Sequence, residues 1–249
     1  MEAREMIRNI EDTAALPDGR GDRFAGYAVI GLPFRSEHVL AMRRFPASSV
    51  GAGYTSVWHR SPEGKWTFYS TVQPELGCSR YFGGEIQQNV MTPIEIVWSG
   101  AAVFRVLIAE TLDWEVTLTE SSTSRLMNGV ARLLPERWWQ AEPMLRAMGY
   151  AARIGLGSGR LNLTGTTPNG QHFIANPRRF WLIDSSRAAI KGVDAGPVGA
   201  LKQQASLSDF LIPQRGIFAV ARAFLNAPAG TRVNGFALKN QNCANAKSR

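Results

Sequence analysis

One of the three histidines in this 249-residue chain, His59, lies between two tryptophans in the stretch TSVWHRSPEGKWTFYS. The SPEG segment predicts a β-hairpin, because Pro62 fits the second position of a type I turn and Gly64 the fourth. A four-residue loop pairs His59 with Trp66, which puts His59 on the apolar face of the hairpin. A slip of one residue in this pairing would reverse that placement.

His59 therefore has two interpretations. It is either a buried histidine whose ring is bonded to a neighbour, or a proton donor and acceptor in an apolar pocket, where burial favours the neutral imidazole. Asp184, in FWLIDSS, is expected on the same side of its strand as Phe180 and Leu182. Apolar surroundings would raise its pKa and make it an acid, although a strand-end aspartate bonded to a turn backbone is the alternative. His59 and Asp184 are our catalytic candidates.

Aromatic residues supply candidate walls for a substrate pocket. The chain has seven tryptophans and twelve phenylalanines, a load that suits a packed core, a lipophilic pocket or both. Trp58, Trp66, Tyr69 and Trp114 are the expected walls. Arg215, in IPQRG, is expected at a loop-to-helix junction, where it could bind an anion or simply cap the helix.

The other carboxylates of the β-rich region are expected to point outward. In LDWEVTLTE, Trp114 and its apolar partners alternate with Asp113 and Glu115, and in PIEIVW Glu95 opposes the apolar face. If the apolar faces point inward, these three acids lie at the surface.

The spacing of apolar residues changes along the chain. Residues 2–15 predict a short amphipathic helix, and residues 27–120 predict successive strands of an antiparallel meander. Helical spacing over 123–155 predicts a helical insertion, after which strands resume. An apolar helix is predicted from 215 to 225 and a disordered polar tail over about 238–249. The sequence thus predicts one mainly β domain with a helical insertion, an antiparallel calycin- or lipocalin-like barrel.

Composition restricts the partners. The formal charge is +8, but no run of Lys or Arg exceeds two residues, and Arg43-Arg44 and Arg178-Arg179 are the densest spots. A solvated basic surface is the first explanation and an anionic membrane surface the second, whereas nucleic acid is not expected. Two cysteines without metal-type spacing and only three histidines predict no metal site, and no cofactor is expected.

The beginning of the chain, MEAREMIRNIEDTAAL, lacks an apolar signal-peptide core, and no apolar run reaches the roughly 20 residues needed to cross a bilayer. We therefore expect a soluble protein of a reducing compartment, the cytoplasm, with membrane association as the alternative.

The run VWHRSPEGKWTFYS, continuing through TPIEIVWSG to VFRVLIAE, is similar to the core hairpins of lipocalin-like proteins of the carotenoid hydratase (hydroxyneurosporene synthase) group. The shared features are a Pro/Gly turn, a Gly-x-Trp strand and an I-x-W-x-G strand edge. This resemblance implies a calycin-type barrel with an apolar interior, in a family of hydratases and cyclases that act on isoprenoid or polyketide chains. It implies no catalytic residue here.

Two functions fit these expectations. In the first, a barrel pocket binds an isoprenoid- or polyketide-like molecule and a cofactor-independent acid/base reaction hydrates, cyclises or isomerises it. In the second, the protein is a non-catalytic carrier of hydrophobic ligands or a membrane-surface protein. The helical insertion would cover the pocket mouth, contact a membrane or pack into the core through its large apolar residues, Leu126, Val130, Trp138, Trp139, Met144 and Met148.

Overall fold

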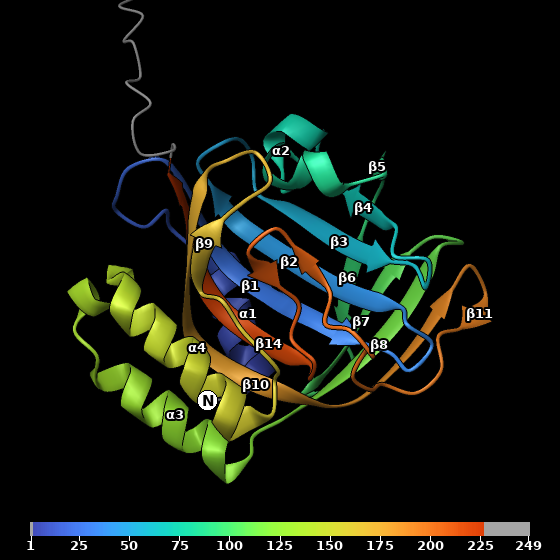
Figure 1. Ribbon diagram of the computed structural model, residues 1–249. Coiled ribbons are helices and arrows are strands. Elements are labelled where there is room, and N and C mark those ends of the chain that lie inside the picture. Colours follow the sequence, from blue (N-terminus) through green and yellow to red (C-terminus); the bar gives the residue numbers. More distant parts are fainter. Residues whose placement is uncertain (1, 227–249) are drawn as a thin grey trace, which may run out of the picture.

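The computed structural model describes residues 2–226 and shows a long curled β-sheet with helices on both of its faces (Figure 1). The strands are β1 (Asp22–Pro33), β2 (Val39–Ser48), β3 (Tyr54–Arg60), β4 (Trp66–Ser70), β5 (Gln88–Met91), β6 (Glu95–Trp98), β7 (Val103–Ile108), β8 (Leu112–Thr119), β9 (Thr164–Thr166), β10 (His172–Ile190), β11 (Val193–Asp194), β12 (Ser206–Leu207), β13 (Phe210–Leu211) and β14 (Ile217–Asn226). The helices are α1 (Ala3–Thr13), α2 (Ser79–Phe82), α3 (Ser122–Leu133) and α4 (Glu142–Leu156), with short 3₁₀ turns η1 (Pro74–Leu76), η2 (Gly83–Glu85) and η3 (Glu136–Gln140).

The main sheet runs in the order β5-β4-β3-β2-β1-β14-β10-β8-β7-β6, and the short strands β9 and β11 pair with β10. Neighbouring strands in this sheet are antiparallel except for β4 and β5. These two are parallel because the segment between them crosses back through η1, α2 and η2. Within residues 2–226 no pairing joins β5 to β6. The protein is therefore mainly β, as expected, but the sheet is a mixed, curled half-barrel, and the predicted antiparallel calycin barrel is not confirmed.

Helix α1 fills one face of the curled sheet. Ala3 and Ile7 are buried in a cluster with residues of β1, β2, β7, β8, β10 and β14. The same face receives Trp114, whose indole Nε1 donates a 2.9 Å hydrogen bond to Ser186 Oγ. The regular alternation of β8 agrees with the outward placement expected for Asp113 and Glu115. Around Ala3 and Ile7 of α1 this face is therefore a packed apolar core.

The opposite face of the sheet is covered by α2, by the β12–β13 hairpin and by α3 and α4 (Figure 1). Strand alternation in β2 sends Val39, Ala41 and Phe45 to this side, whereas Leu40 and Met42 face α1. Both faces of the central strands are thus buried, because each has its own apolar cluster.

The hairpin around His59 differs from the predicted register by one residue. Arg60 pairs with Trp66 and His59 with Thr67. The loop has three residues in place of the expected four, because Ser61 pairs with Lys65 and Gly64 takes a left-handed φ of +84° inside the turn. Trp66 therefore lies on the face opposite His59, and the expectation that the two side chains share a face was wrong.

Two further element predictions need correction. Residues 217–226, part of the predicted C-terminal helix, form β14, which is paired on both sides by β1 and β10. From the sequence alone, a short apolar run is compatible with either a buried helix or a central strand. This run is a strand because it pairs along both edges, with β1 and with β10. Among the strands expected after the helical insertion, the segments QHFIANP and RRFWLIDS form one long strand, β10, with a register shift between Pro177 and Arg179. The predicted tail and Cys243 lie outside the described residues.

The predicted helical segment contains α3 and α4. Ser121 caps α3 by accepting a 3.1 Å hydrogen bond from the backbone N–H of Ser124. Asn128 fastens α3 to β10: its Nδ2 donates to the carbonyl of Phe180 at 2.8 Å, and its Oδ1 accepts from the N–H of Phe180 at 3.0 Å. No helix among the described residues has both the length and the apolar character needed to cross a bilayer.

Candidate ligand-binding site

Among the described residues, β2 directs the charged side chain of Arg43 into the apolar cluster on the side away from α1. It is 5% exposed, and its guanidinium carbon lies 3.4 Å from the ring centroid of Trp58 and 5.3 Å from that of Phe210. Nη2 donates a 3.2 Å hydrogen bond to the carbonyl of Ile30. Nη1 is buried and has no hydrogen-bond partner within residues 2–226.

Burial lowers the pKa of Arg43 to about 10, so the guanidinium is still a cation at neutral pH. None of the ion pairs among the described residues includes Arg43. Stacking on Trp58 offsets part of the cost of burying this charge, but a buried cation without an anion remains unfavourable. Arg43 therefore offers an anion-binding group inside an apolar environment.

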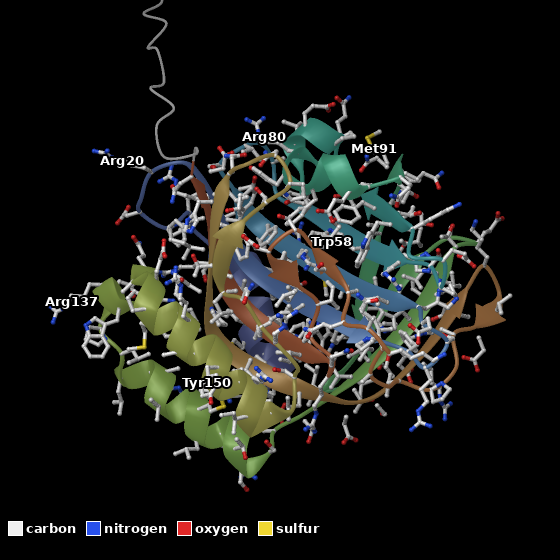
Figure 2. The ribbon with its side chains drawn as sticks, in the orientation of Figure 1. Arg20, Trp58, Arg80, Met91, Arg137 and Tyr150 are labelled. Atoms are coloured by element: carbon white, nitrogen blue, oxygen red, sulfur yellow. The ribbon has the colours of Figure 1, made fainter. Side chains whose placement is uncertain are left out.

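A cavity of about 120 Å³ lies beside Arg43. Figure 2 shows Trp58, one of its walls, near the centre of the molecule. We call this cavity the Arg43 pocket; its walls are mainly aromatic and aliphatic and include Phe24, Phe45, Tyr54, Trp58, Cys78, Tyr81, Phe82, Phe173, Phe210 and Leu225.

The pocket also contains a pair of neutral hydrogen-bonding groups. The hydroxyl of Tyr54 and Sγ of Cys78 lie 3.2 Å apart. Burial raises the pKa of Tyr54 and that of the Cys78 thiol, so both keep their protons at neutral pH. The indole Nε1 of Trp58 donates to Ser56 Oγ at 3.1 Å and is thereby satisfied. The pocket therefore contains the unpaired cation of Arg43 and two weak, neutral proton donors, while Arg222, which also lines it, is paired with Glu136.

A second cavity, of about 280 Å³, lies between the sheet and helices α3 and α4. We call it the α3–α4 groove; the helices contribute Leu126, Met127, Val130, Ala131, Leu134, Met148, Ala151, Ala152 and Leu156. The groove and the Arg43 pocket share the walls Ile30, Leu161, Leu163, Pro177 and Ala219. The two cavities are therefore neighbours that share these side chains.

The expected substrate-binding residues divide between the two faces. Trp58 lines the Arg43 pocket, and Trp66 is buried in the same cluster but does not line the cavity. Tyr69 and Trp114 pack in the α1 cluster on the other face. Arg215 is exposed and donates a 3.3 Å hydrogen bond to the carbonyl of Leu156, the last residue of α4, at a strand start in place of the expected helix N-terminus.

The two catalytic candidates are not brought together. His59 lies on the α1 side of β3, and its Nε2 is 2.9 Å from Nδ1 of His38. Burial and the neighbouring His38 lower the pKa of His59 to about 4. Asp184, on β10, lies at a register shift against β8 and is exposed. The expectation of apolar surroundings for Asp184 was therefore wrong. Strands β2, β1 and β14 separate β3 from β10.

Sequence reasoning overlooked Arg43, although a signal was present. The run HVLAMRRF contains four consecutive apolar residues, which fits a strand buried on both faces, and in a strand two adjacent arginines must point to opposite faces. In a sheet that is covered on both sides, one of the two must then be buried. Arg43-Arg44 was interpreted only as a basic spot on the surface.

No protein-family model matches the sequence, and no curated protein matches it. The resemblance to the carotenoid hydratase group is therefore unconfirmed. Among solved structures, the chain is similar to acetoacetate decarboxylase from Legionella pneumophila subsp. pneumophila str. Philadelphia 1, with 8% identity, a TM-score of 0.38 and coverage of 88% of this chain and 93% of that one. It is also similar to a second acetoacetate decarboxylase structure, with 11% identity, a TM-score of 0.40 and coverage of 91% and 96%. Similarity at this level does not establish a shared fold or activity.

Proposed function

We propose that the protein binds an amphiphilic small molecule with one anionic group, placing the anion at Arg43 and the apolar part against the aromatic walls. The observation that carries this proposal is the unpartnered, buried Nη1 of Arg43 at an apolar cavity. A carboxylate suits this position, because it accepts charge-assisted hydrogen bonds from a guanidinium in its own plane.

The size of the two cavities sets the size of the ligand. A dry cavity of about 150 Å³ holds a molecule as large as benzene. The Arg43 pocket, at about 120 Å³, has room for a head group and a few carbon atoms. A longer chain would continue past Leu161 and Leu163 into the α3–α4 groove. We infer a fatty-acid-like or isoprenoid-like carboxylate.

Binding without chemistry fits the lining better than acid/base catalysis. The described residues that line the Arg43 pocket include no histidine, lysine, aspartate or glutamate. A general acid or base works best when its pKa lies near the working pH, and burial moves the pKa of Tyr54 and Cys78 away from neutrality. A carrier or sensor needs only the cation and the apolar walls.

Hydration, cyclisation or isomerisation of the bound molecule is the second candidate function. The Tyr54–Cys78 pair favours it, because a hydroxyl and a thiol 3.2 Å apart could pass a proton to a ligand held by Arg43. In that case a Tyr54→Phe variant would keep its affinity for the ligand and lose turnover. A carrier would show no turnover in either form.

Calorimetric titration with three ligands of equal chain length tests the binding proposal. Decanoate should bind, decanol should bind at least about tenfold more weakly, and decylammonium should not bind, because only the carboxylate pairs with Arg43. Extraction of the purified protein followed by negative-ion mass spectrometry should release an organic acid. Equal affinity for decanoate and decanol would contradict the role of Arg43.

A further inference from the structure

Most of the large apolar side chains that the described residues expose lie on one layer, formed by α3, η3 and α4. Leu133 is 84% exposed, Ile154 68% and Tyr150 64%. Figure 2 shows Tyr150 and Arg137 on this layer, on the opposite side of the molecule from Met91. The apolar members of the exposed face are Leu126, Val130, Leu133, Trp138, Tyr150 and Ile154.

The same layer is strongly basic. Its only acidic residues are Glu136 and Glu142, and both are in ion pairs, Glu136 with Arg178 and Arg222 and Glu142 with Arg146. The remaining arginines of the layer form no ion pair within residues 2–226: Arg125, Arg132, Arg137 and Arg153. Apolar side chains and unneutralised cations therefore occupy one surface.

Helical spacing arranges the two kinds of residue in parallel stripes. On α3, Leu126 and Leu133 are seven positions apart and share one side, while Arg125 and Arg132 follow the adjacent side with the same spacing. On α4, Tyr150 and Ile154 share a side that Arg146 and Arg153 flank. The start of α3 meets the end of α4, with Gly155 against Thr123, so the two helices lie side by side in opposite directions.

We propose that the exposed face of α3, η3 and α4 docks on an anionic membrane surface. Apolar side chains with flanking arginines are the pattern of helices that lie in the interface of a bilayer, since the apolar groups enter the acyl boundary while the cations attract acidic headgroups. Charge complementarity selects this occupant, because a second copy of the chain would place the same arginines against each other.

The docked face also contains the mouth of the α3–α4 groove. Leu126 and Val130 line the groove and are 69% and 53% exposed. A docked molecule would thus present the opening of the groove to lipid, from which an amphiphile could reach the Arg43 pocket. This last step rests on the proposed function, whereas docking itself does not.

Flotation of the full-length protein with lipid vesicles tests docking. We expect it to float with vesicles of equal parts phosphatidylserine and phosphatidylcholine, and to float poorly with vesicles of phosphatidylcholine alone or with anionic vesicles in high salt. Decanoate binding is measured on the same preparation without vesicles. If the protein floats but does not bind decanoate, the proposed function fails; if it binds decanoate but does not float, the docking proposal fails.

Matched variants locate the docking surface. Leu133→Ser/Ile154→Ser removes two exposed apolar groups from the face, and Met91→Ser/Val193→Ser removes two that are 65% and 70% exposed elsewhere. Only the first pair should reduce the bound fraction. For charge, Arg132→Gln/Arg153→Gln should weaken binding to anionic vesicles on the order of tenfold, whereas the control Arg187→Gln/Lys191→Gln should leave it unchanged.

Three results would overturn the proposal. The first is no flotation of the wild type with anionic vesicles. The second is equal flotation with neutral and anionic vesicles, or equal losses in the face and control variants. The third is a concentration-dependent dimer in solution that Leu133→Ser/Ile154→Ser abolishes, which would show that the face binds a second copy of the chain.

Discussion

Arg43 and Arg44 are adjacent in β2, and their side chains lie on opposite faces of the sheet. Arg44 faces α1, where its Nε and Nη2 donate to the carboxylate of Glu11 at 3.0 and 2.7 Å. Burial acts to raise the pKa of Glu11, but hydrogen bonds from Arg44 and Tyr27 outweigh it and lower that pKa. Arg43 faces the other side of the sheet and has no carboxylate partner among the described residues. One arginine is neutralised by a carboxylate, and the other is the group at which we propose that the ligand's anion binds.

Replacing Arg43 by leucine should separate binding from folding. Removal of a buried, unpaired charge should leave stability unchanged or raise it by about 1–4 kcal/mol. Affinity for decanoate should fall on the order of 10²-fold or more, because the carboxylate loses its buried partner. Thermal melts and calorimetric titration of Arg43→Leu measure the two effects.

Arg44→Leu is the matched control for this variant. It should retain decanoate affinity and lose about 1 kcal/mol of stability or less, since its ion pair with Glu11 is partly exposed. Equal loss of binding in both variants would show that the general positive charge of β2 attracts the ligand, without a specific site at Arg43.

Narrowing the α3–α4 groove should shorten the ligands that the protein accepts. Met148 lines the groove and is partly buried, so Met148→Trp adds volume there without touching Arg43. Affinity for hexadecanoate should fall about tenfold or more, because each methylene kept out of the groove loses about 0.8 kcal/mol. Hexanoate should bind as it does to the wild type. A parallel loss for both acids would place the chain outside the groove.

The thiol of Cys78 should be inert in the folded protein. Burial raises its pKa, and the thiolate is the reactive form. In a Cys243→Ser background, labelling of Cys78 by a disulfide reagent should be at least about tenfold slower than that of a free cysteine and should become fast in denaturant. Fast labelling of the native protein would mean that the Arg43 pocket opens readily to solvent.

Sequence periodicity predicted much of the fold and little of the site. The strict alternation of β8 and the helical spacing of α3 depend on local pattern, so they could be read directly. The open, curled shape of the sheet could not be predicted, because the parallel β4–β5 pair and the packing of α1 on the sheet depend on residues far apart in the chain. The same holds for β14, whose strand form depends on two partners far away in the chain.

The site was missed for a related reason. Trp58 lines a cavity, but the expected register put His59 on the side of Trp66, and the turn that contains Gly64 reverses this. The side chain that matters, Arg43, is recognisable only when both faces of the sheet are known to be covered. Burial of a charge is a tertiary property.

His59 should make the protein sensitive to acid. The pKa of its imidazole is lowered from 6.5 to about 4 in the folded state, so between these values the unfolded chain binds more protons. Stability from this group is complete above pH 6.5 and is lost as the pH falls through about 4. Chemical denaturation at several pH values should show this decline, and His59→Gln should flatten it. Identical slopes for both proteins would mean that other groups cause the acid sensitivity.

Replacement of the two neighbouring tryptophans of η3 by alanine should affect different properties: stability for one and binding to anionic vesicles for the other. Trp139 is 1% exposed, with the guanidinium of Arg178 4.6 Å from its ring centroid, so it fastens the helical layer to the sheet. Trp139→Ala should cost about 3–5 kcal/mol in denaturant unfolding. Trp138 is 42% exposed, and Trp138→Ala should change stability by about 0.5 kcal/mol or less while it reduces flotation with anionic vesicles. Each variant is the other's control, because both remove one indole from the same turn. A large loss of stability in Trp138→Ala, with flotation unchanged, would show that this indole belongs to the core and would remove it from the docking surface.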